Sequence, residues 1–206
     1  MVGLNLFFSP VASAQIDFIS KAVKINCNNS QGAGFWIDSR IIATAKHVVE
    51  NCSTAIVENN DGFKFRVSKI ELSRKSDIAY LIMVKSNNSI SYANFPKNLP
   101  VSGEYVYAVG APIDGLVLSK GKFVRSYANN LGEWIEIDIP ADHGNSGGPV
   151  FSDSGMVGML ISKDLNYQTI NAYSIGYVLE DYIDNKPNSD ESESQLVAPN
   201  SASKSP

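Results

Sequence analysis

The sequence carries twelve short segments with the composition of β-strands, in two sets of six that are separated by a polar connector. Each segment is rich in Val, Ile, Phe or Tyr and is bounded by Asn, Asp, Gly or Ser, as strands that end in turns are. The connector, residues 86–102, holds Pro96 and Pro100 among clustered polar residues. About six strands in each half predicts an all-β chain made of two closed barrels or two sandwiches. The segments are Ala22–Cys27, Gly34–Ile37, Arg40–Ala43, Thr54–Glu58, Phe63–Leu72 and Ile78–Val84, then Glu104–Val109, Leu116–Tyr127, Trp134–Ile139, Pro149–Phe151, Val157–Ser162 and Ala172–Gly176.

One helix is predicted, near the C-terminal end, at Val178–Asp184. Val178, Leu179, Tyr182 and Ile183 give it an apolar side. The residues beyond it are mostly polar and cannot bury enough apolar surface to offset the entropy lost on ordering. We therefore expect residues 185–206 to form a disordered tail.

The first residues of the chain resemble the end of a signal peptide. A short apolar stretch leads to the small residues Ala12, Ser13 and Ala14, and cleavage would follow Ala14, although the usual basic start is missing. The alternative is a mature N-terminal segment that is merely apolar. The first interpretation makes residues 1–14 a signal-peptide remnant and predicts a secreted or periplasmic protein.

Charge and hydropathy exclude two classes of partner. The formal net charge is −4 and no stripe of Lys or Arg appears, so we expect no nucleic-acid binding. No apolar run approaches the roughly 20 residues that span a bilayer, so no stable membrane insertion is expected. The sequence sets no oligomeric state.

The chain has two cysteines, Cys27 and Cys52, which lie on either side of His47. An even, low count fits one disulfide in an oxidising compartment, and the alternative is a pair of unpaired buried thiols. A bridge would pin both ends of the segment that contains His47.

The sharpest local motif is Gly144-Asn-Ser-Gly-Gly-Pro149, with Ser146 at its centre. A serine hydroxyl becomes a useful nucleophile when it is exposed, aligned with a base and placed beside donors for an oxyanion. Glycines on both sides allow unusual backbone angles and leave backbone N–H groups uncovered. An ordinary glycine-rich turn is the alternative.

Two histidines are available as the base, His47 and His143. His143 is three residues before Ser146 on the same loop, too local to lie squarely opposite the serine. His47 follows a predicted strand that ends in small residues. A partly buried structural histidine is the alternative for His47, and the presence of the serine motif in the same chain favours the catalytic interpretation.

An imidazole base works best when a carboxylate fixes its tautomer. Asp77 stands at the start of a nearly continuous apolar strand, where a carboxylate would be partly buried and would need a partner. Asp61 and Asp114 each precede a glycine, which is typical of turn residues. Asp77 is therefore the preferred candidate, with a cap at the strand edge as its alternative.

Taken in chain order, Thr44-Ala-Lys-His47, Asp77-Ile-Ala79 and the serine motif resemble the trypsin-like serine proteases. Within that family they resemble the bacterial HtrA-like and glutamyl-endopeptidase-like branches. Supporting stretches are 32–37, 108–112 and 118–125, and the resemblance covers roughly residues 20–183.

The resemblance implies a chymotrypsin-like fold of two six-stranded antiparallel barrels with a cleft between them. It implies a protease domain at 15–184, with barrel one at about 20–85 and barrel two at about 103–177. Ser146 would attack a peptide carbonyl, His47 would take its proton and Asp77 would stabilise the imidazolium. The backbone N–H groups of Gly144 and Ser146 would bind the oxyanion, with no metal or cofactor required.

Two departures from the family pattern carry consequences. Asn145 stands where many trypsin-like enzymes place the Asp that binds a newly freed N-terminus, so we expect no activation of that type. The chain is also too short for the PDZ-type peptide-binding domain that follows many HtrA-like protease domains, and we expect none.

The same resemblance places a substrate pocket beside Ser146. Ile161 matches a histidine that glutamyl endopeptidases use, and Pro140 replaces the acid that a basic preference would need. A small or medium apolar residue before the scissile bond is therefore predicted, while His143 and Lys163 leave a weaker case for acidic residues. The candidate substrate-binding residues are Ala141, His143, Ile161, Ser162 and Tyr173.

Three functions fit these motifs. The first is a serine endopeptidase that acts on protein or peptide substrates. The second is a binding or adhesion module on a protease fold that has lost catalysis, and the third is a protease used for esterolysis or self-cleavage. No triad residue is replaced, which favours the first.

Overall fold

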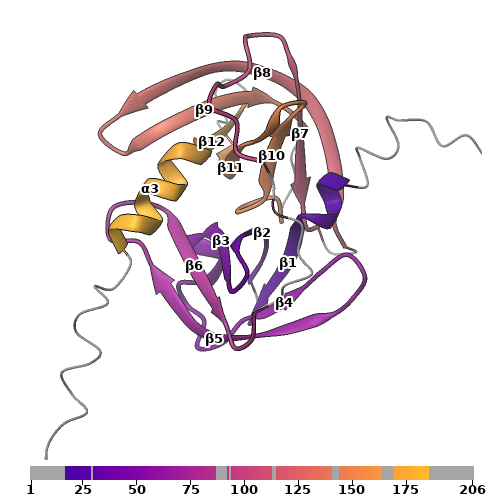
Figure 1. The fold of residues 1–206 in the computed structure, drawn as a ribbon, viewed down its shortest axis with the longest axis vertical. Coiled ribbons are helices and arrows are strands. Elements are labelled where there is room, and N and C mark those ends of the chain that lie inside the picture. Colours follow the sequence, from indigo (N-terminus) through magenta and orange to yellow (C-terminus); the bar gives the residue numbers. More distant parts are fainter. Residues whose placement is uncertain are drawn as a thin grey trace, which may run out of the picture.

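The computed structural model describes residues 17–28, 30–86, 92, 94–112, 115–140, 144–163 and 169–185. These residues form two closed six-stranded antiparallel barrels and a C-terminal helix, shown in Figure 1. The predicted all-β architecture of two barrels with a short C-terminal helix is confirmed, and the alternative of two sandwiches is wrong. Asn185, predicted as the first residue of the tail, is instead the last residue of the C-terminal helix. Residues 186–206 of the predicted tail and the N-terminal segment 1–14 lie outside the described residues.

Barrel one contains the first six strands, in the spatial order β1-β2-β3-β6-β5-β4. Its strands pack the fully buried side chains of Ile25, Phe35, Ile42 and Leu81 into the barrel interior. A helical turn at residues 17–20 precedes it. The strands are β1 (Ala22–Cys27), β2 (Ser30–Asp38), β3 (Ile41–Ala45), β4 (Ile56–Glu58), β5 (Lys64–Leu72) and β6 (Ile78–Met83).

Barrel two contains the remaining strands, in the spatial order β10-β11-β12-β9-β8-β7. Its own interior cluster includes Val106, Ile135, Ile137 and Val150, all with no exposed surface. The strands are β7 (Tyr105–Gly110), β8 (Val117–Asn129), β9 (Gly132–Asp138), β10 (Pro149–Ser152), β11 (Gly155–Lys163) and β12 (Ile170–Ser174).

The apolar core continues across the junction between the barrels. The cluster that fills barrel one also includes Val109, Phe151 and Met159 from barrel two. Burial of this kind, at about 25 cal/mol per Å² of apolar surface, makes the two barrels one packed unit. The junction can therefore hold groups from both barrels in a fixed relation.

Helix α3 (Ile175–Asn185) follows β12 directly and runs along one side of the molecule from barrel two toward barrel one (Figure 1). Its Val178 is fully buried. The Tyr80 hydroxyl of β6 lies 2.9 Å from the carbonyl oxygen of Val178, within hydrogen-bond reach. The C-terminal helix is thus tied to a strand of the first barrel.

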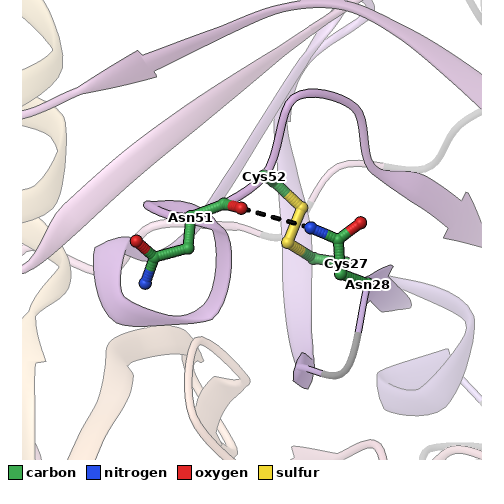
Figure 2. The surroundings of a disulfide bond; sticks show 4 residues. All are labelled: Cys27, Asn28, Asn51 and Cys52. Carbon is green, nitrogen blue, oxygen red and sulfur yellow. Dashed lines mark hydrogen bonds between the residues drawn. A yellow bond between two sulfur atoms is a disulfide. The ribbon is translucent and has the colours of Figure 1, made fainter.

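A disulfide joins Cys27, the last residue of β1, to Cys52, with 5.7 Å between the two Cα atoms. Beside it, the side-chain amide of Asn28 donates to the carbonyl oxygen of Asn51 at 3.2 Å (Figure 2). Asn28 has a φ of 50°, a left-handed conformation that Asn tolerates better than most residues. The predicted bridge is confirmed, and it closes the segment that contains His47.

Candidate active site

His47 and Asp77 meet because β3 and β6 pair with each other. The antiparallel register sets Ala45 opposite Ile78, so the residues after β3 and before β6 lie at the same barrel edge. There the chain forms the short helix α2 (Lys46–Val49), which the sequence does not predict. Val48 and Val49 are buried, which leaves His47 facing outward on this turn.

The Asp77 carboxylate holds His47 at two points. The backbone N–H of His47 donates to Asp77 Oδ1 at 3.0 Å, and Nδ1 of the ring lies 2.6 Å from Asp77 Oδ2. This ring hydrogen bond raises the pKa of His47 above its ordinary value, against the opposing effect of partial burial. The charges of Asp77 and of Glu50 act in the same direction as the hydrogen bond.

Ser146 lies in the turn between β9 and β10, and glycines set the shape of that turn. Gly144 has a φ of 94° and Gly147 a φ of 81°, values that L side chains rarely adopt. The Gly147 N–H donates to the carbonyl of Leu160 at 2.8 Å, and the Gly144 carbonyl accepts from Ala111 at 3.0 Å. The turn is therefore anchored on both sides within barrel two.

The serine turn also touches barrel one. The carbonyl oxygen of Ser146 accepts a hydrogen bond of 2.9 Å from the N–H of Ala33 in β2. A Cβ added at Gly32 would lie 2.8 Å from that oxygen and 2.7 Å from Cγ2 of Val48, the neighbour of His47. Gly32 is thus the spacer between the histidine helix and the serine turn, a role that the sequence does not reveal.

The Ser146 hydroxyl donates to the carbonyl oxygen of Ile161 at 3.4 Å, and within the described residues it makes no hydrogen bond to the His47 ring. The backbone N–H groups of Gly144 and Ser146 have no acceptor among the same residues. The structure therefore holds the histidine and carboxylate in contact, with the serine turn beside them and the hydroxyl turned toward β11.

Three of the predicted pocket residues fall on described backbone. Ile161 is buried next to the serine hydroxyl, and Ser162 follows it in β11. Tyr173 is buried too, and its hydroxyl accepts the N–H of Asp77 at 3.4 Å. Tyr173 thus contacts the backbone of the carboxylate residue, which the sequence does not indicate. Ala141 and His143 lie outside the described residues.

Metal-ligand clusters and membrane-spanning helices are both absent from the described part of the chain. No group of three or more His, Cys, Asp or Glu residues gathers there as metal ligands would. None of its helices is long and apolar enough to span a bilayer.

Comparison with known families gives a match over most of the two barrels. The family described as "Trypsin-like peptidase domain" matches residues 32–159. The chain is 30% identical over 137 residues to the probable periplasmic serine endoprotease DegP-like of Rhizobium meliloti, which covers 62% of this chain and 27% of that relative. A protein of the same name from Chlamydia pneumoniae is 31% identical over 136 residues, covering 62% and 27%. The chain thus matches about a quarter of the length of these relatives.

Solved structures agree on the fold. The Rv3671c protease from M. tuberculosis in its active form superposes with a TM-score of 0.74 at 19% identity, covering 85% of this chain and 84% of that one. An inactive form of Rv3671c protease gives a TM-score of 0.73 at 19% identity, covering 86% and 93%. At this identity the similarity concerns the arrangement of the two barrels.

Proposed function

The chain belongs to the trypsin-like peptidase domain family, and we propose that it is a serine endopeptidase with Ser146 as nucleophile, His47 as general base and Asp77 as the orienting carboxylate. The observation that carries this proposal is the double contact between His47 and Asp77, at 3.0 Å to the backbone and 2.6 Å to the ring. A carboxylate on Nδ1 fixes the tautomer that leaves Nε2 free to accept a proton.

The proposed reaction begins when the Ser146 hydroxyl rotates from the Ile161 carbonyl toward His47. That rotation is a change between staggered side-chain rotamers, and catalytic hydrogen bonds commonly tighten only when substrate is bound. Oγ attacks the peptide carbonyl and its proton passes to Nε2 of His47. The imidazolium is stabilised by Asp77, whose hydrogen bond and charge already raise the pKa of the ring.

The N–H groups of Gly144 and Ser146 are the proposed donors to the oxyanion. Donors of this kind contribute most when they are held in place before the reaction. The anchoring of the turn through Ala111, Leu160 and Ala33 supports this role. His47 then protonates the leaving amine, and water hydrolyses the acyl-enzyme formed on Ser146.

For specificity, we propose a small or medium apolar residue before the scissile bond. Ile161 supports this preference, because it brings no charged side chain to this part of β11. Its backbone carbonyl oxygen lies 3.4 Å from Ser146 Oγ. Cleavage profiling of a peptide library tests it. A dominant preference for Lys, Arg or acidic residues would contradict the proposed pocket.

We further propose that the protein acts in a secreted or periplasmic location. The disulfide between Cys27 and Cys52 fits an oxidising compartment, and the related DegP-like proteins are named as periplasmic. N-terminal sequencing of protein from the native host tests this, because a retained Met1 would remove the signal-peptide argument.

Labelling by a fluorophosphonate probe tests the catalytic proposal. The wild-type protein should be labelled at Ser146, and Ser146→Ala should abolish labelling. His47→Ala should slow it by several orders of magnitude, because the hydroxyl loses its base. A correctly folded wild type that the probe does not label would favour a catalytically silent binding module on the same fold.

A further inference from the structure

A buried carboxylate lies behind the candidate active site, on helix α3. Asp181 is 2% exposed, and four neutral groups donate hydrogen bonds to its side chain. Its Oδ1 accepts from the hydroxyls of Ser73 at 2.7 Å and Ser76 at 3.0 Å. Its Oδ2 accepts from the Tyr80 hydroxyl at 2.9 Å and from the Asn185 amide at 3.0 Å. A buried carboxylate that has this many donors is fixed firmly in place.

The two serines belong to the turn that ends at Asp77. Ser73 Oγ accepts the backbone N–H groups of Lys75 at 3.2 Å and of Ser76 at 3.1 Å, and the Ser76 hydroxyl lies 2.9 Å from it. The Ser73 N–H donates to the carbonyl of Ile78 at 2.9 Å, which closes the turn. Asp77 is therefore the residue between Ser76, which Asp181 binds, and the first residue of β6.

We propose that Asp181 is a positioning residue, which fixes the turn of residues 73–77 against helix α3 and thereby holds the Asp77 carboxylate in register with His47. This inference rests on the proposed function for the role of that pair. Asp181 itself touches neither the histidine nor the serine turn in any described contact. Its contribution passes through the backbone that carries Asp77.

Other contacts on the same turn leave it with few alternative positions. The Lys46 ammonium donates to the Ser73 carbonyl at 3.1 Å, and the Asp77 N–H donates to the Tyr173 hydroxyl at 3.4 Å. Tyr173 lies in β12, two residues before α3 begins at Ile175. The carboxylate residue is thus supported by β12 through Tyr173 and by α3 through Asp181.

The effect of Asp181 on the pKa of His47 through the position of Asp77 can be separated from a direct effect of its charge. Lys75 pairs with Asp184 on the outside of α3, and burial raises the pKa of both Tyr80 and Tyr177, so these phenols remain neutral. The pKa of His47 is raised first by the hydrogen bond with Asp77 and then by the charges of Asp77 and Glu50. Asp181→Ala and Asp181→Asn both remove the charge of Asp181, so a lower pKa of His47 in the alanine variant than in the asparagine variant would report a displaced Asp77.

The test measures the pKa of the His47 ring by NMR titration in a Ser146→Ala background, where catalysis plays no part. The chain has two histidines, so a His143→Gln variant assigns the signals. Asp181→Ala should lower the pKa of His47 toward its ordinary value of about 6.5. In the active background it should lower kcat by about 10- to 100-fold with KM nearly unchanged, as small misplacements of catalytic groups do.

Asp181→Asn is the rescuing variant, because its amide oxygen can still accept from both serine hydroxyls. It should restore most of kcat and the raised pKa of His47. Val178→Ala is the matched control, since it removes buried apolar surface from the same helix without touching the turn. It should reduce thermal stability while leaving the pKa of His47 at the wild-type value.

If Asp181→Ala does not fold, Ser76→Ala removes one of the hydrogen bonds between the turn and Asp181. It should also lower the pKa of His47, by a smaller amount. The proposal is overturned if these variants lose stability while the pKa of His47 stays at the value found in Val178→Ala. The NMR result is independent of the fluorophosphonate result, so failure of the enzymatic proposal and failure of this inference are distinguishable.

Discussion

Substitution of Gly32 by alanine tests whether close packing between the barrels sets the distance from histidine to serine. Gly32 lies in β2, where an added Cβ would be 2.7 Å and 2.9 Å from the two Cγ atoms of Val48 and 2.8 Å from the carbonyl oxygen of Ser146. The new methyl group would thus press on the helix that carries His47 and on the nucleophile's own backbone.

The expected magnitude follows from these distances. Ordinary van der Waals contact begins near 3.4 Å, so Val48 and the Ser146 carbonyl must together recede by several tenths of an ångström on each side. Valine has few rotamers available and the carbonyl is tied to Ala33 at 2.9 Å, so the backbone itself must shift. Overpacking of this kind costs about 1–3 kcal/mol of stability. A shift approaching 1 Å between base and nucleophile lowers kcat/KM by about 100-fold.

Gly34→Ala is the matched control in the same strand. Its added Cβ would be 2.7 Å from Cδ1 of Ile25, 2.8 Å from the Ala43 carbonyl oxygen and 2.9 Å from Cγ2 of Ile42, which is equal crowding away from the serine turn. Both variants should therefore lose similar stability in urea unfolding. Only the Gly32 variant should lose kcat/KM per folded molecule, measured on a substrate from the peptide library.

Equal kcat/KM in the two alanine variants, at equal folded fraction, would refute this reasoning. It would mean that the contact between β2 and the serine turn does not control the distance between the catalytic groups. A larger loss in the Gly34 variant would point to barrel one stability as the controlling property.

Three further predictions follow from the site and its supports. The ring of His47 must be neutral to act as a base, and its pKa is raised. In a pH–rate profile, kcat/KM should therefore fall toward acid pH with an apparent pKa above the ordinary value of about 6.5. An apparent pKa below that value would contradict the assignment. Replacing Cys27 and Cys52 with serine opens a loop with a sequence separation of 25, so it should lower the free energy of unfolding by about 3–4 kcal/mol in denaturant titration. Gly147→Ala should prevent formation of the serine turn, because its added Cβ would lie 2.3 Å from a backbone oxygen of β2 at a φ of 81°. Gly103 is the control, with a φ of 88° and nothing within 4 Å of an added Cβ. Gly103→Ala should lower the free energy of unfolding by only about 1–2 kcal/mol in the same titration.

Most of the strands were predictable because each one satisfies a local rule. The segment predicted as strand Ala172–Gly176 is wrong at its end, because β12 stops at Ser174 and α3 begins at Ile175. β6 (Ile78–Met83) lies in an apolar run that is bounded by Asp77 and Lys85, and β1 begins and ends at the predicted residues 22 and 27. The closure of each set into a barrel is not a local property, since it depends on pairs such as β1 with β4. The strand count therefore predicts two compact units, and the register decides that they are barrels.

The candidate site was predictable in its residue types and less so in its supports. Glycines around Ser146 are a strong local signal, because Gly144 and Gly147 adopt a positive φ that other residues avoid. Helix α2 escapes prediction because four residues, Lys46–Val49, are too few to show a helical period. Its helical form comes from the packing of Val48 and Val49 under the turn.

The contacts that hold Asp77 show why such supports cannot be predicted from sequence patterns. Ser73 and Asp181 are 108 residues apart, and Asp77 and Tyr173 are 96 apart, so no periodicity links either pair. Serine, tyrosine and aspartate also occur throughout the chain as turn residues and caps, so each one alone is more simply interpreted as a local structural residue than as a support for Asp77. The turn of residues 73–77, strand β12 and helix α3 meet at Asp77, because β12 leads directly into α3 and α3 crosses to barrel one. The geometry of His47 and Asp77 thus depends on the second barrel although both residues lie in the first, which is why Asp181→Ala on α3 should change the pKa of His47 whereas Val178→Ala on the same helix should change only stability.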